Sequence, residues 1–455
     1  MSAGATESTE RMGSTERRKS AADTSGTGSG SGTASAAAGR ESAADRDDPG
    51  GGGSAGGGSA GGGEAGAAPA TAGPSRTEGR SRTPGTSRTP GTPRTATEAV
   101  LLVGGKGTRL RPLTVNTPKP MITAAGVPFL THQLARARAA GIEHIVLATS
   151  YLAEVFEPYF GDGSALGLHL EYVTETDPLG TGGAIRNVAH RLHSAPGDPV
   201  LVFNGDILTG LDIPALVATH RRAGADVSLH LTKVPDPRAF GLVPTDPDGR
   251  VTAFLEKPQT PEEIVTDQIN AGAYVFTRSV IDTIPVGRPV SVERETFPEL
   301  LAAGAHLRGM VDSTYWLDLG TPHAFVRGSA DLVLGRAPSP AVPGRLGELL
   351  VLDGADVSDD AKLSGGTCVA SGAVIGSGAR VHGTAVLAGA HIEPGAVVKD
   401  SFIGVGAHVG ARTVLDGVVL GDGASVGPDN ELTPGARIWC GARIAPGSIR
   451  FSSDQ

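Results

Sequence analysis

Residues 100–114 read VLLVGGKGTRLRPLT, an apolar run that passes directly into a loop rich in glycine and arginine. The four aliphatic residues at its start predict a strand that is buried on both faces of a parallel sheet. The glycines after it allow backbone N–H groups to approach phosphate oxygens closely. Because open α/β sheets bind ligands at the carboxyl ends of their strands, we expect this loop to line a site for a phosphorylated ligand.

The same loop concentrates positive charge. Arg109 and Arg111 lie within it, and Lys119 follows shortly after, between two prolines. Three cations on one short segment repel one another unless they share an anion, which favours a ligand site over a simple turn. The second proline directs Lys119 toward an extended backbone. The segment is not a P-loop, because Lys106 is followed by glycine and not by serine or threonine.

Beyond this loop, apolar strands alternate with helical segments. This alternation predicts an α/β fold in which a mostly parallel sheet carries helices on both faces. The predicted strands occupy residues 144–148, 168–173, 200–203 and 226–232, and the predicted helices occupy residues 128–140, 182–192 and 213–223.

From residue 351 to residue 444 the pattern changes to one aliphatic residue in every six. Such a repeat predicts a parallel β-helix, in which three units make one triangular coil and the aliphatic side chains point inward. We expect a slip of the register around residues 393–401. The predicted inward residues are Val351, Val357, Leu363, Val369, Ile375, Val381 and Leu387 before the slip, and Ile403, Val409, Leu415, Leu420, Val426, Leu432, Ile438 and Ile444 after it.

Composition divides the rest of the chain. The 455 residues include 67 Gly and 32 Pro, and this excess lies in the first 96 residues and in the C-terminal repeat. The first segment has too little apolar surface to offset the entropy of ordering, so we predict a flexible leader. The predicted organisation is a leader at 1–96, an α/β domain at 97–335, a linker at 336–349, a β-helix at 350–448 and a tail at 449–455.

Charge and cysteine content exclude several classes of function. The formal net charge is −9, which argues against a broad nucleic-acid-binding face. Cys368 and Cys440 form neither a metal-ligand spacing nor a disulfide framework. No stretch approaches the ~18 apolar residues of a membrane span, and the N-terminus lacks the apolar core of a signal peptide. We therefore expect a cytoplasmic protein that has neither nucleic acid nor a membrane as a partner.

Several motifs together resemble the signature of the sugar-phosphate nucleotidyltransferase family. They cover roughly residues 97–334, and a hexapeptide β-helix also follows this domain in the family. The resemblance implies a Rossmann-like domain followed by a left-handed parallel β-helix, and an enzyme that joins a nucleoside triphosphate to a sugar 1-phosphate and releases pyrophosphate. The motifs lie, in family order, at residues 104–114, 118–120, 204–206, 254–258, 270–272 and 316–320.

The resemblance also implies roles for individual residues. Arg109 resembles the arginine that holds the triphosphate and stabilises the transition state, and Lys119 resembles the lysine that contacts the nucleotide phosphates. Asp206 and Asp318 resemble the pair that holds Mg²⁺, and Lys257 resembles the lysine that grips the sugar phosphate. The implied nucleotide site further includes Gly104, Gly105, Gly107, Thr108, Gly180 and Thr181, and the implied sugar pocket includes Gly241, Glu256 and Asn270.

This chemistry explains why no Ser/His/Asp or Cys/His constellation stands out in the sequence. A sugar phosphate has a second pKa near ~6, so it is largely ionised at neutral pH and is already a nucleophile. The protein must instead align two polyanions and neutralise charge on the α-phosphate. The aspartate pair suits Mg²⁺, which prefers one or two carboxylates together with phosphate oxygens.

The identity of the base and the sugar rests on resemblance alone. The segments SVERETFP (residues 291–298) and PLGTGG (residues 178–183) resemble those of mannose-1-phosphate guanylyltransferases, which implies GTP and mannose 1-phosphate. Glucose-1-phosphate adenylyl- or thymidylyltransferase activity and a regulatory paralogue that binds a nucleotide-sugar remain alternatives. An acyltransferase function of the β-helix, through His382, His391 or His408, is a further alternative. The β-helix more readily suits self-association, so we expect a homo-oligomer.

Overall fold

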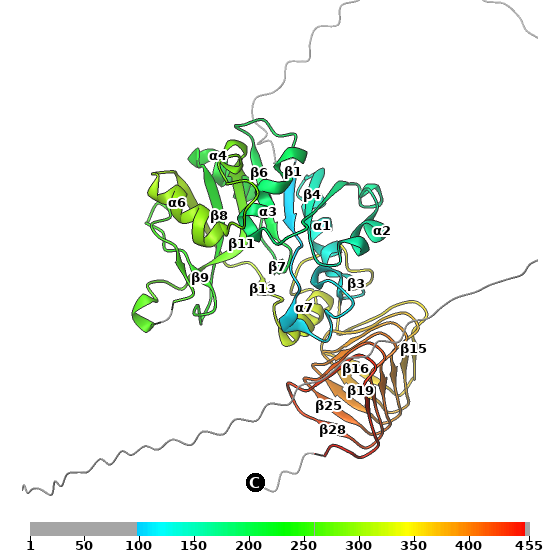
Figure 1. The fold of residues 1–455 in the computed structure, drawn as a ribbon. Helices are drawn as coiled ribbons and strands as arrows, with labels where there is room; N and C mark the ends of the chain where they lie inside the picture. The colour runs from blue at the N-terminus through cyan, green and yellow to red at the C-terminus, as the bar shows by residue number, and fades with distance from the viewer. Residues whose placement is uncertain (1–97, 259, 451–455) are drawn as a thin grey trace, which may run out of the picture. The chain divides into compact units, whose positions relative to one another are not determined.

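The computed structural model describes residues 98–258 and 260–450 of the chain, and Figure 1 shows their arrangement. The predicted leader at 1–96 lies outside the described residues, as does most of the predicted tail. Within the described residues, no helix has both the length and the apolar character that crossing a bilayer requires.

A nine-stranded sheet forms the centre of the N-terminal part. The apolar run that leads into the glycine- and arginine-rich loop at residues 104–114, called the signature loop below, forms β1. This strand pairs in parallel with β4 on one side and β6 on the other, so the predicted buried strand is confirmed. β11 then runs antiparallel to both β6 and β8, which makes the sheet mixed. The strands are β1 (Glu98–Leu102), β4 (His144–Thr149), β5 (His169–Thr174), β6 (Pro199–Asn204), β8 (Val227–Lys233), β9 (Gly241–Leu242), β10 (Leu255–Glu256), β11 (Gln268–Thr277) and β12 (Leu307–Asp312).

Helices cover both faces of this sheet, because alternate strand residues enter two separate apolar cores. Val100 and Val202 pack with α3 and α6, whereas Leu101 and Leu201 pack with α1 and α4. The helix predicted at 213–223 has the bounds of α4, where Asp212 accepts a hydrogen bond from the Ala215 N–H at the N-cap. The helices are α1 (Phe129–Ala139), α2 (Phe156–Phe160), α3 (Gly180–Val188), α4 (Ile213–Ala223), α5 (Arg278–Ile281), α6 (Phe297–Ala302) and α7 (Pro322–Val333).

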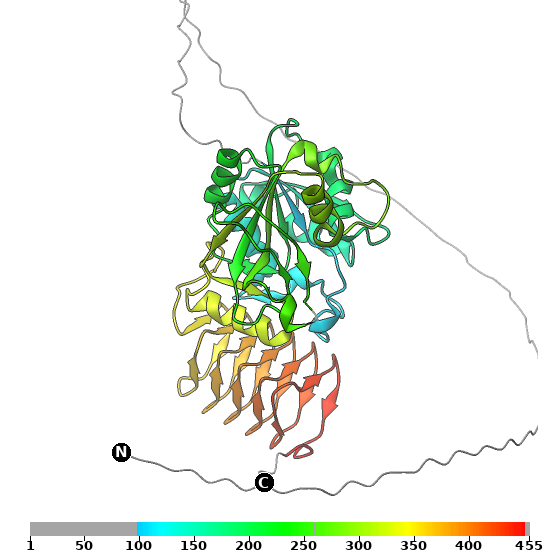
Figure 2. The same cartoon turned by 90° about the vertical axis from the view of Figure 1, so that its left-hand side faces the viewer.

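The C-terminal part is a stack of short parallel strands, which Figure 2 shows as successive coils. One sheet contains β14 (Leu349–Val351), β17 (Thr367–Val369), β20 (Ala385–Val386), β23 (Phe402–Ile403), β26 (Val419–Leu420) and β29 (Arg437–Ile438). A second contains β15 (Asp356–Val357), β18 (Val374–Ile375), β21 (His391–Ile392), β24 (His408–Val409), β27 (Ser425–Val426) and β30 (Arg443–Ile444). The third contains β16 (Lys362–Ser364), β19 (Arg380–His382), β22 (Val397–Lys399), β25 (Val414–Asp416) and β28 (Glu431–Leu432).

The predicted β-helix is therefore confirmed, but its predicted register is wrong in two places. The inward residue after Val381 is Val386, whereas Leu387 packs in the core shared with the N-terminal part. The repeat also has no single register slip at 393–401, because Ile392, just before this range, and Val398, within it, both point inward. Instead, strand partners in the middle coils lie 17 residues apart, as Phe402 and Val419 do. One corner of each such coil is short because one residue with positive φ makes the turn: Gly383 (55°), Asp400 (45°) and Gly417 (60°).

The β14–β29 sheet packs against α7 through one apolar cluster. Phe402 of β23 meets Phe325 of α7 with ring centroids 6.2 Å apart, and both side chains are fully buried. A Cβ placed on Gly366 would lie 2.4 Å from the Ala330 carbonyl oxygen, so only glycine allows this approach of the coil to α7. The cluster also contains Leu110 and Leu113 of the signature loop.

We expect Phe402→Ala to lower the free energy of unfolding by about 3–5 kcal/mol, because it removes a buried ring and leaves a cavity between coil and helix. Val405→Ala is the matched control, since Val405 is 49% exposed in the next turn and should change stability by less than about 0.5 kcal/mol. Denaturant unfolding of the full chain measures both. Equal stabilities of the two variants would contradict the shared core.

Candidate active site

The signature loop leaves the carboxyl end of β1 and is fixed by its own polar contacts. Gly107 has a left-handed φ of 55° and precedes a 3₁₀ turn at Thr108–Leu110. Its carbonyl accepts a hydrogen bond of 2.8 Å from the Thr114 hydroxyl. The Gly105 N–H, at a φ of 105°, donates to Ser150 Oγ at 3.2 Å. The exposed residues of this loop include Gly104, Gly105, Thr108 and Arg109.

The two predicted metal-binding aspartates lie side by side beside this loop. Asp206 leaves β6 and precedes β7 (Ile207–Thr209), which pairs antiparallel with β13 (Trp316–Asp318), so Asp318 lies opposite Ile207. The Leu319 N–H donates to the Asp206 carbonyl at 3.0 Å. A Cβ on Gly205 would lie 2.5 Å from the Leu102 carbonyl oxygen, so glycine is required where β6 turns past β1.

Lys119 joins the two aspartates. Its Nζ donates to Asp206 Oδ2 at 2.8 Å and lies 3.9 Å from Asp318 Oδ1. Burial, followed by repulsion from Asp206, raises the pKa of the Asp318 carboxyl, and Lys119 and Arg109 oppose this shift. A Cβ on Gly320 would lie 2.9 Å from Arg109 Nη2 and 3.0 Å from Asp318 Oδ1. The absence of a side chain there lets the Arg109 guanidinium approach the pair.

The pair fits a divalent cation by its donor chemistry. Asp318 Oδ1 is buried, and among residues 98–258 and 260–450 it accepts no hydrogen bond. A buried carboxylate oxygen without a donor is costly, and a second carboxylate beside it adds repulsion. Hard divalent cations take such oxygens as ligands. In this structure the Lys119 ammonium partly offsets the same negative charge.

The residues predicted for the sugar pocket lie on and beside the short β9–β10 hairpin. Gly241 lies opposite Glu256, and a Cβ on Gly241 would lie 2.7 Å from Glu256 Oε2. Lys257 follows with a left-handed φ of 52°, and its Nζ lies 3.6 Å from Glu256 Oε1. Asn270 lies in β11 where the register shifts, and its Nδ2 donates to the Tyr274 hydroxyl at 2.8 Å.

Two aromatic residues connect this hairpin to the aspartate pair, and the sequence analysis assigned no role to either of them. Trp316 is two residues before Asp318 on β13, and its ring meets the Phe240 ring edge-on at 5.5 Å. Its Nε1 donates to the Ala271 carbonyl at 3.0 Å, next to Asn270. These contacts hold the β9–β10 hairpin and β13 in one arrangement.

The residues predicted to contact the base open α3. Gly180 has a φ of 69°, and a Cβ there would lie 2.6 Å from the Val290 carbonyl oxygen, so the start of α3 approaches the backbone of the loop at residue 290 closely. The Thr181 hydroxyl donates to Glu293 Oε2 and accepts from the Val292 N–H, both at 2.9 Å. Its side chain therefore braces the segment 291–298 against the start of α3.

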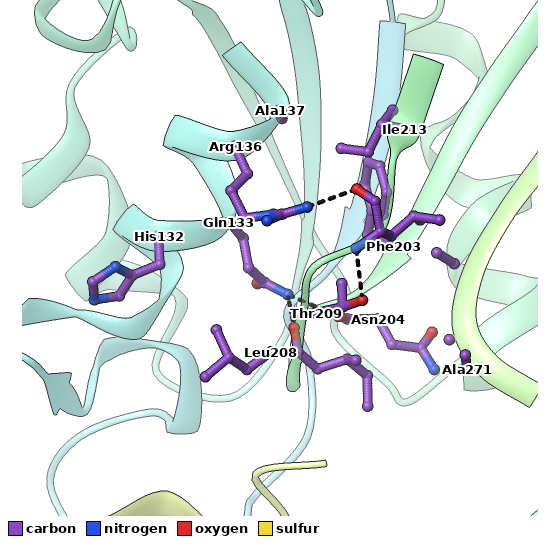
Figure 3. Close-up of a pocket in the computed structure, with 14 residues that line it drawn as sticks. His132, Gln133, Arg136, Ala137, Phe203, Asn204, Leu208, Thr209, Ile213 and Ala271 are labelled. Carbon is purple, nitrogen blue, oxygen red and sulfur yellow. Dashed lines mark hydrogen bonds between the residues drawn. The ribbon is translucent and has the colours of Figure 1, made fainter. Parts of the chain in front are cut away.

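Figure 3 shows a pocket that is lined by residues of α1, β6 and β7 and that the sequence motifs did not indicate. Gln133 of α1 donates from Nε2 to the carbonyls of Asn204 at 3.0 Å and Ile207 at 3.2 Å. These two carbonyls flank Gly205 and Asp206, so one amide fixes the turn that presents the carboxylate. No local pattern marks Gln133, because its partners lie more than 70 positions away in the chain.

Comparison with known proteins agrees with this geometry. A family model described as nucleotidyl transferase matches residues 98–333. Mannose-1-phosphate guanylyltransferase of Mycobacterium tuberculosis is 61% identical over 358 residues, which cover 78% of this chain and 98% of that protein. The chain belongs to the sugar-phosphate nucleotidyltransferase family. The resemblance inferred from the sequence motifs is thus confirmed, and the enzyme class with it.

The C-terminal part of the nucleotidyltransferase also matches a family model, and relatives of lower identity share the same activity in their names. A model described as the GMPPB C-terminal domain matches residues 345–448. Mannose-1-phosphate guanylyltransferase catalytic subunit beta of Drosophila pseudoobscura pseudoobscura is 38% identical over 59% of this chain and 72% of that protein. Mannose-1-phosphate guanylyltransferase 1 of Arabidopsis thaliana is 34% identical over 62% of this chain and 79% of that protein. Enzymes of this family generally use a divalent metal ion, which accords with the paired carboxylates.

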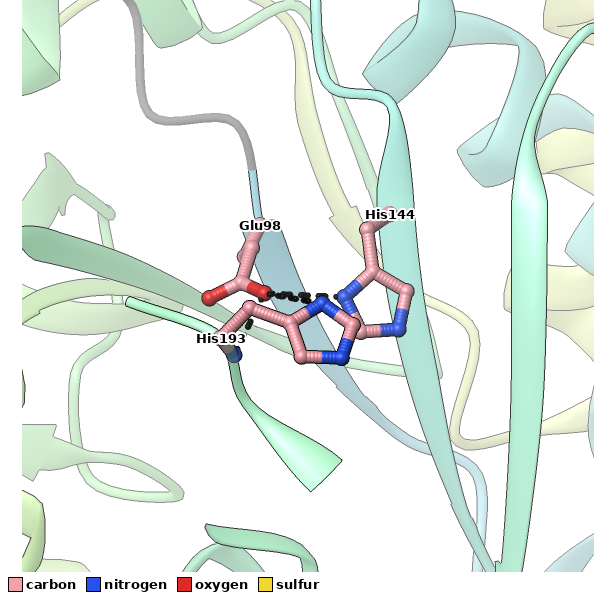
Figure 4. Close-up of side chains that lie close together, drawn as sticks. All are labelled: Glu98, His144 and His193. Atoms are coloured by element: carbon pink, nitrogen blue, oxygen red, sulfur yellow. Dashed lines mark hydrogen bonds and ion pairs between the residues drawn. The ribbon is translucent and has the colours of Figure 1, made fainter. Parts of the chain in front are cut away.

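A second polar cluster lies at the opposite, amino ends of the strands of the nucleotidyltransferase (Figure 4). His144 Nδ1 lies 2.9 Å from Glu98 Oε1, and His144 Nε2 lies 3.0 Å from Glu171 Oε1. Glu98 also accepts hydrogen bonds from the His193 and Ser194 N–H groups and from the Ser194 hydroxyl. Glu98 and His144 are both buried.

The ring geometry of this cluster argues against a metal site. The His144 ring stacks between those of His169 and His193, with centroids 5.0 and 4.8 Å apart and planes inclined by 22° and 15°. The lone pairs of stacked imidazoles run side by side, whereas a tetrahedral metal needs them to converge. Both nitrogens of His144 also already face a carboxylate. The cluster is therefore a buried imidazolium held between two carboxylates.

This cluster makes the stability of the enzyme depend on pH. The Glu98 hydrogen bond raises the pKa of His144 against the opposing effect of burial. Burial would raise the pKa of Glu98, but hydrogen bonds from His144 and Ser194 outweigh it and lower this pKa to about 2. The His144 contribution is complete below pH ~6.5 and is lost as pH rises through its raised pKa, whereas that of Glu98 is lost as pH falls from ~4.5 toward 2.

We expect His144→Gln to lower the free energy of unfolding by about 1–3 kcal/mol at pH 6, and by less at pH 9, because the stabilisation by the charged imidazole declines as pH rises through the raised pKa of His144. Denaturant unfolding at the two pH values measures the difference. His190→Gln, at an exposed position, is the control and should show no pH-dependent difference from wild type. A His144→Gln deficit that is as large at pH 9 as at pH 6 would contradict a charged His144.

Proposed function

We propose that the chain transfers a guanylyl group from GTP to mannose 1-phosphate, which yields GDP-mannose and pyrophosphate. The observation that carries this proposal is the convergence of Lys119 on Asp206 and Asp318, at 2.8 and 3.9 Å, beside the glycine-rich loop. Identity of 61% to a mannose-1-phosphate guanylyltransferase over nearly its whole length supports the choice of base and sugar.

In the proposed reaction, a phosphate oxygen of mannose 1-phosphate bonds to the α-phosphorus of GTP. The bond from the α-phosphorus to the oxygen that bridges to the β-phosphate breaks, and pyrophosphate leaves with the electron pair. The attacking phosphate is already ionised, since its second pKa is near ~6, so no side chain needs to remove a proton. The protein contributes alignment and charge neutralisation.

The basic residues would divide this work. Arg109, which already lies beside Asp318, would neutralise the triphosphate, and Lys257 would hold the sugar phosphate. Lys119, whose ammonium donates to Asp206, would also contact a nucleotide phosphate oxygen. Asp206 and Asp318 would hold Mg²⁺, which when bound supplies Lewis-acid neutralisation of phosphate charge.

The remaining predicted residues would shape the two substrate sites. Backbone N–H groups of the glycine-rich loop and of the first turn of α3 suit phosphate and base recognition. The phosphate-side residues are Gly104, Gly105, Gly107 and Thr108, the base-side residues are Gly180 and Thr181, and the sugar-side residues are Gly241, Glu256 and Asn270.

We further propose that the enzyme works in the cytoplasm as a homo-oligomer. Both cysteines, Cys368 and Cys440, are free thiols, as is usual for proteins of reducing compartments. Exposed apolar side chains on the outer faces of the β-helix, such as Val397, suit self-association.

A matrix of nucleoside triphosphates against sugar 1-phosphates tests the proposed substrates. We expect pyrophosphate release to be fastest with GTP and mannose 1-phosphate, by more than about tenfold in kcat/KM over each other pair. Faster turnover with glucose 1-phosphate and ATP or dTTP would assign an adenylyl- or thymidylyltransferase. Binding of GDP-mannose with no turnover of any pair would assign a regulatory paralogue.

We expect Asp318→Asn to lower kcat by about 100-fold or more, because it removes half of the carboxylate pair at the reacting phosphate. The same change should not lower the free energy of unfolding, since burial, followed by repulsion from Asp206, raises the pKa of Asp318 and so disfavours its charged form. Steady-state kinetics and denaturant unfolding measure the two effects. Asp353→Asn, at an exposed position of the β-helix, is the control. Near-native activity of Asp318→Asn would rule out the proposed role.

A further inference from the structure

A single row of outward-facing residues runs along the β14–β29 sheet of the β-helix. Strand pairing places these residues in register, one from each coil. The first five are apolar, buried and packed in the core shared with the N-terminal part. The sixth, at the far end of the row, is a charged residue. The row is Leu350, Cys368, Ala385, Phe402, Val419 and Arg437.

The charged residue reaches the signature loop. Arg437 Nη1 donates to the Arg109 carbonyl at 2.8 Å and to the Arg111 carbonyl at 3.0 Å. In the same coil, Cys440 Sγ lies 3.8 Å from the Pro112 carbonyl oxygen. The last coil of the β-helix therefore contacts three carbonyls within four residues of the loop that carries Arg109.

The other contacts of the signature loop restrain its ends more than they restrain Arg109. Leu110 and Leu113 anchor one side of it in the shared core, and the Thr114 hydroxyl holds the Gly107 carbonyl. Arg109 itself is exposed and lies in the middle of a 3₁₀ turn of only three residues, Thr108–Leu110. The Arg437 guanidinium donates a charge-assisted hydrogen bond to the Arg109 carbonyl. This bond fixes the backbone position from which the Arg109 side chain extends.

We infer that Arg437 is a positioning residue, through which the β-helix sets the direction of Arg109 at the triphosphate. The inference rests on the proposed role of Arg109. Both carbonyls accept from the same guanidinium nitrogen, Nη1, so one donor group holds two points of the loop at once. A small displacement of a charge-neutralising group is costly to the transition state, so the effect falls on kcat.

A purely structural role of Arg437 would produce a different result. Its side chain is exposed, so water can replace its two hydrogen bonds when the chain unfolds or when the residue is removed. The five apolar residues of the row stay in place in either case and continue to hold the two parts together. Loss of Arg437 should therefore affect the loop and leave global stability unchanged.

The test compares Arg437→Ala, Arg437→Lys and Arg443→Ala in the full chain. Arg443 lies in the same coil, on the neighbouring sheet, and is exposed, so it controls for loss of charge. We expect Arg437→Ala to lower kcat by about tenfold with little change in the KM for mannose 1-phosphate. Arg437→Lys should recover part of the loss, and Arg443→Ala should match wild type. All four proteins should have the same melting temperature.

Amide hydrogen exchange of residues 104–114 gives a second measurement that does not need turnover. The Leu110, Arg111 and Leu113 N–H groups donate within the loop, so their exchange reports its opening. Faster exchange in Arg437→Ala than in Arg443→Ala supports the inference, even if GTP and mannose 1-phosphate prove to be the wrong substrates. Unchanged exchange, unchanged kcat, or a kcat loss that follows a fall in melting temperature would overturn it.

Discussion

The site depends on the balance of charge where β1 and β6 end. Two carboxylates meet there because β13 pairs with β7, and one carboxylate oxygen, Asp318 Oδ1, is buried and accepts no hydrogen bond within the described residues. Lys119 lies between them and offsets only part of their repulsion. Such an arrangement is unfavourable by itself and becomes favourable when cations and phosphates share it. The glycines around it, Gly205 and Gly320, are the positions where any side chain would block this assembly.

The polar residues at the two ends of the parallel strands differ in whether their charges are already paired. The carboxyl ends carry loops with exposed cations and incompletely paired carboxylates, which suits ligand binding. The amino ends carry Glu98, His144 and Glu171, whose charges satisfy one another inside the fold. Carboxylates and cations thus suit a ligand site at one edge and form a structural clamp at the other. What separates the two roles is whether the polar atoms already have partners.

The β-helix is not structurally independent of the N-terminal part. Its β14–β29 sheet shares a core with α7 and with Leu110 and Leu113 of the signature loop. The final coil then contacts the carbonyls of Arg109, Arg111 and Pro112. A long repeat can carry such a contact because each coil fixes the next, so the position of the last coil is set by the whole stack.

The sequence by itself determined the features that local patterns encode: the buried strand at 100–103, the helix at 213–223, the aliphatic repeat and the crowded cations of the signature loop. Its motifs, by resemblance, also named the aspartates that the structure brings together. Only the tertiary structure decided the 17-residue coils, the support of Asp206 by Gln133, the bridge made by Trp316, and the contact of Arg437 with a loop 328 positions away. The reason is physical: local periodicity reports which face of an element is buried, whereas a hydrogen bond between distant segments leaves no mark on either segment alone.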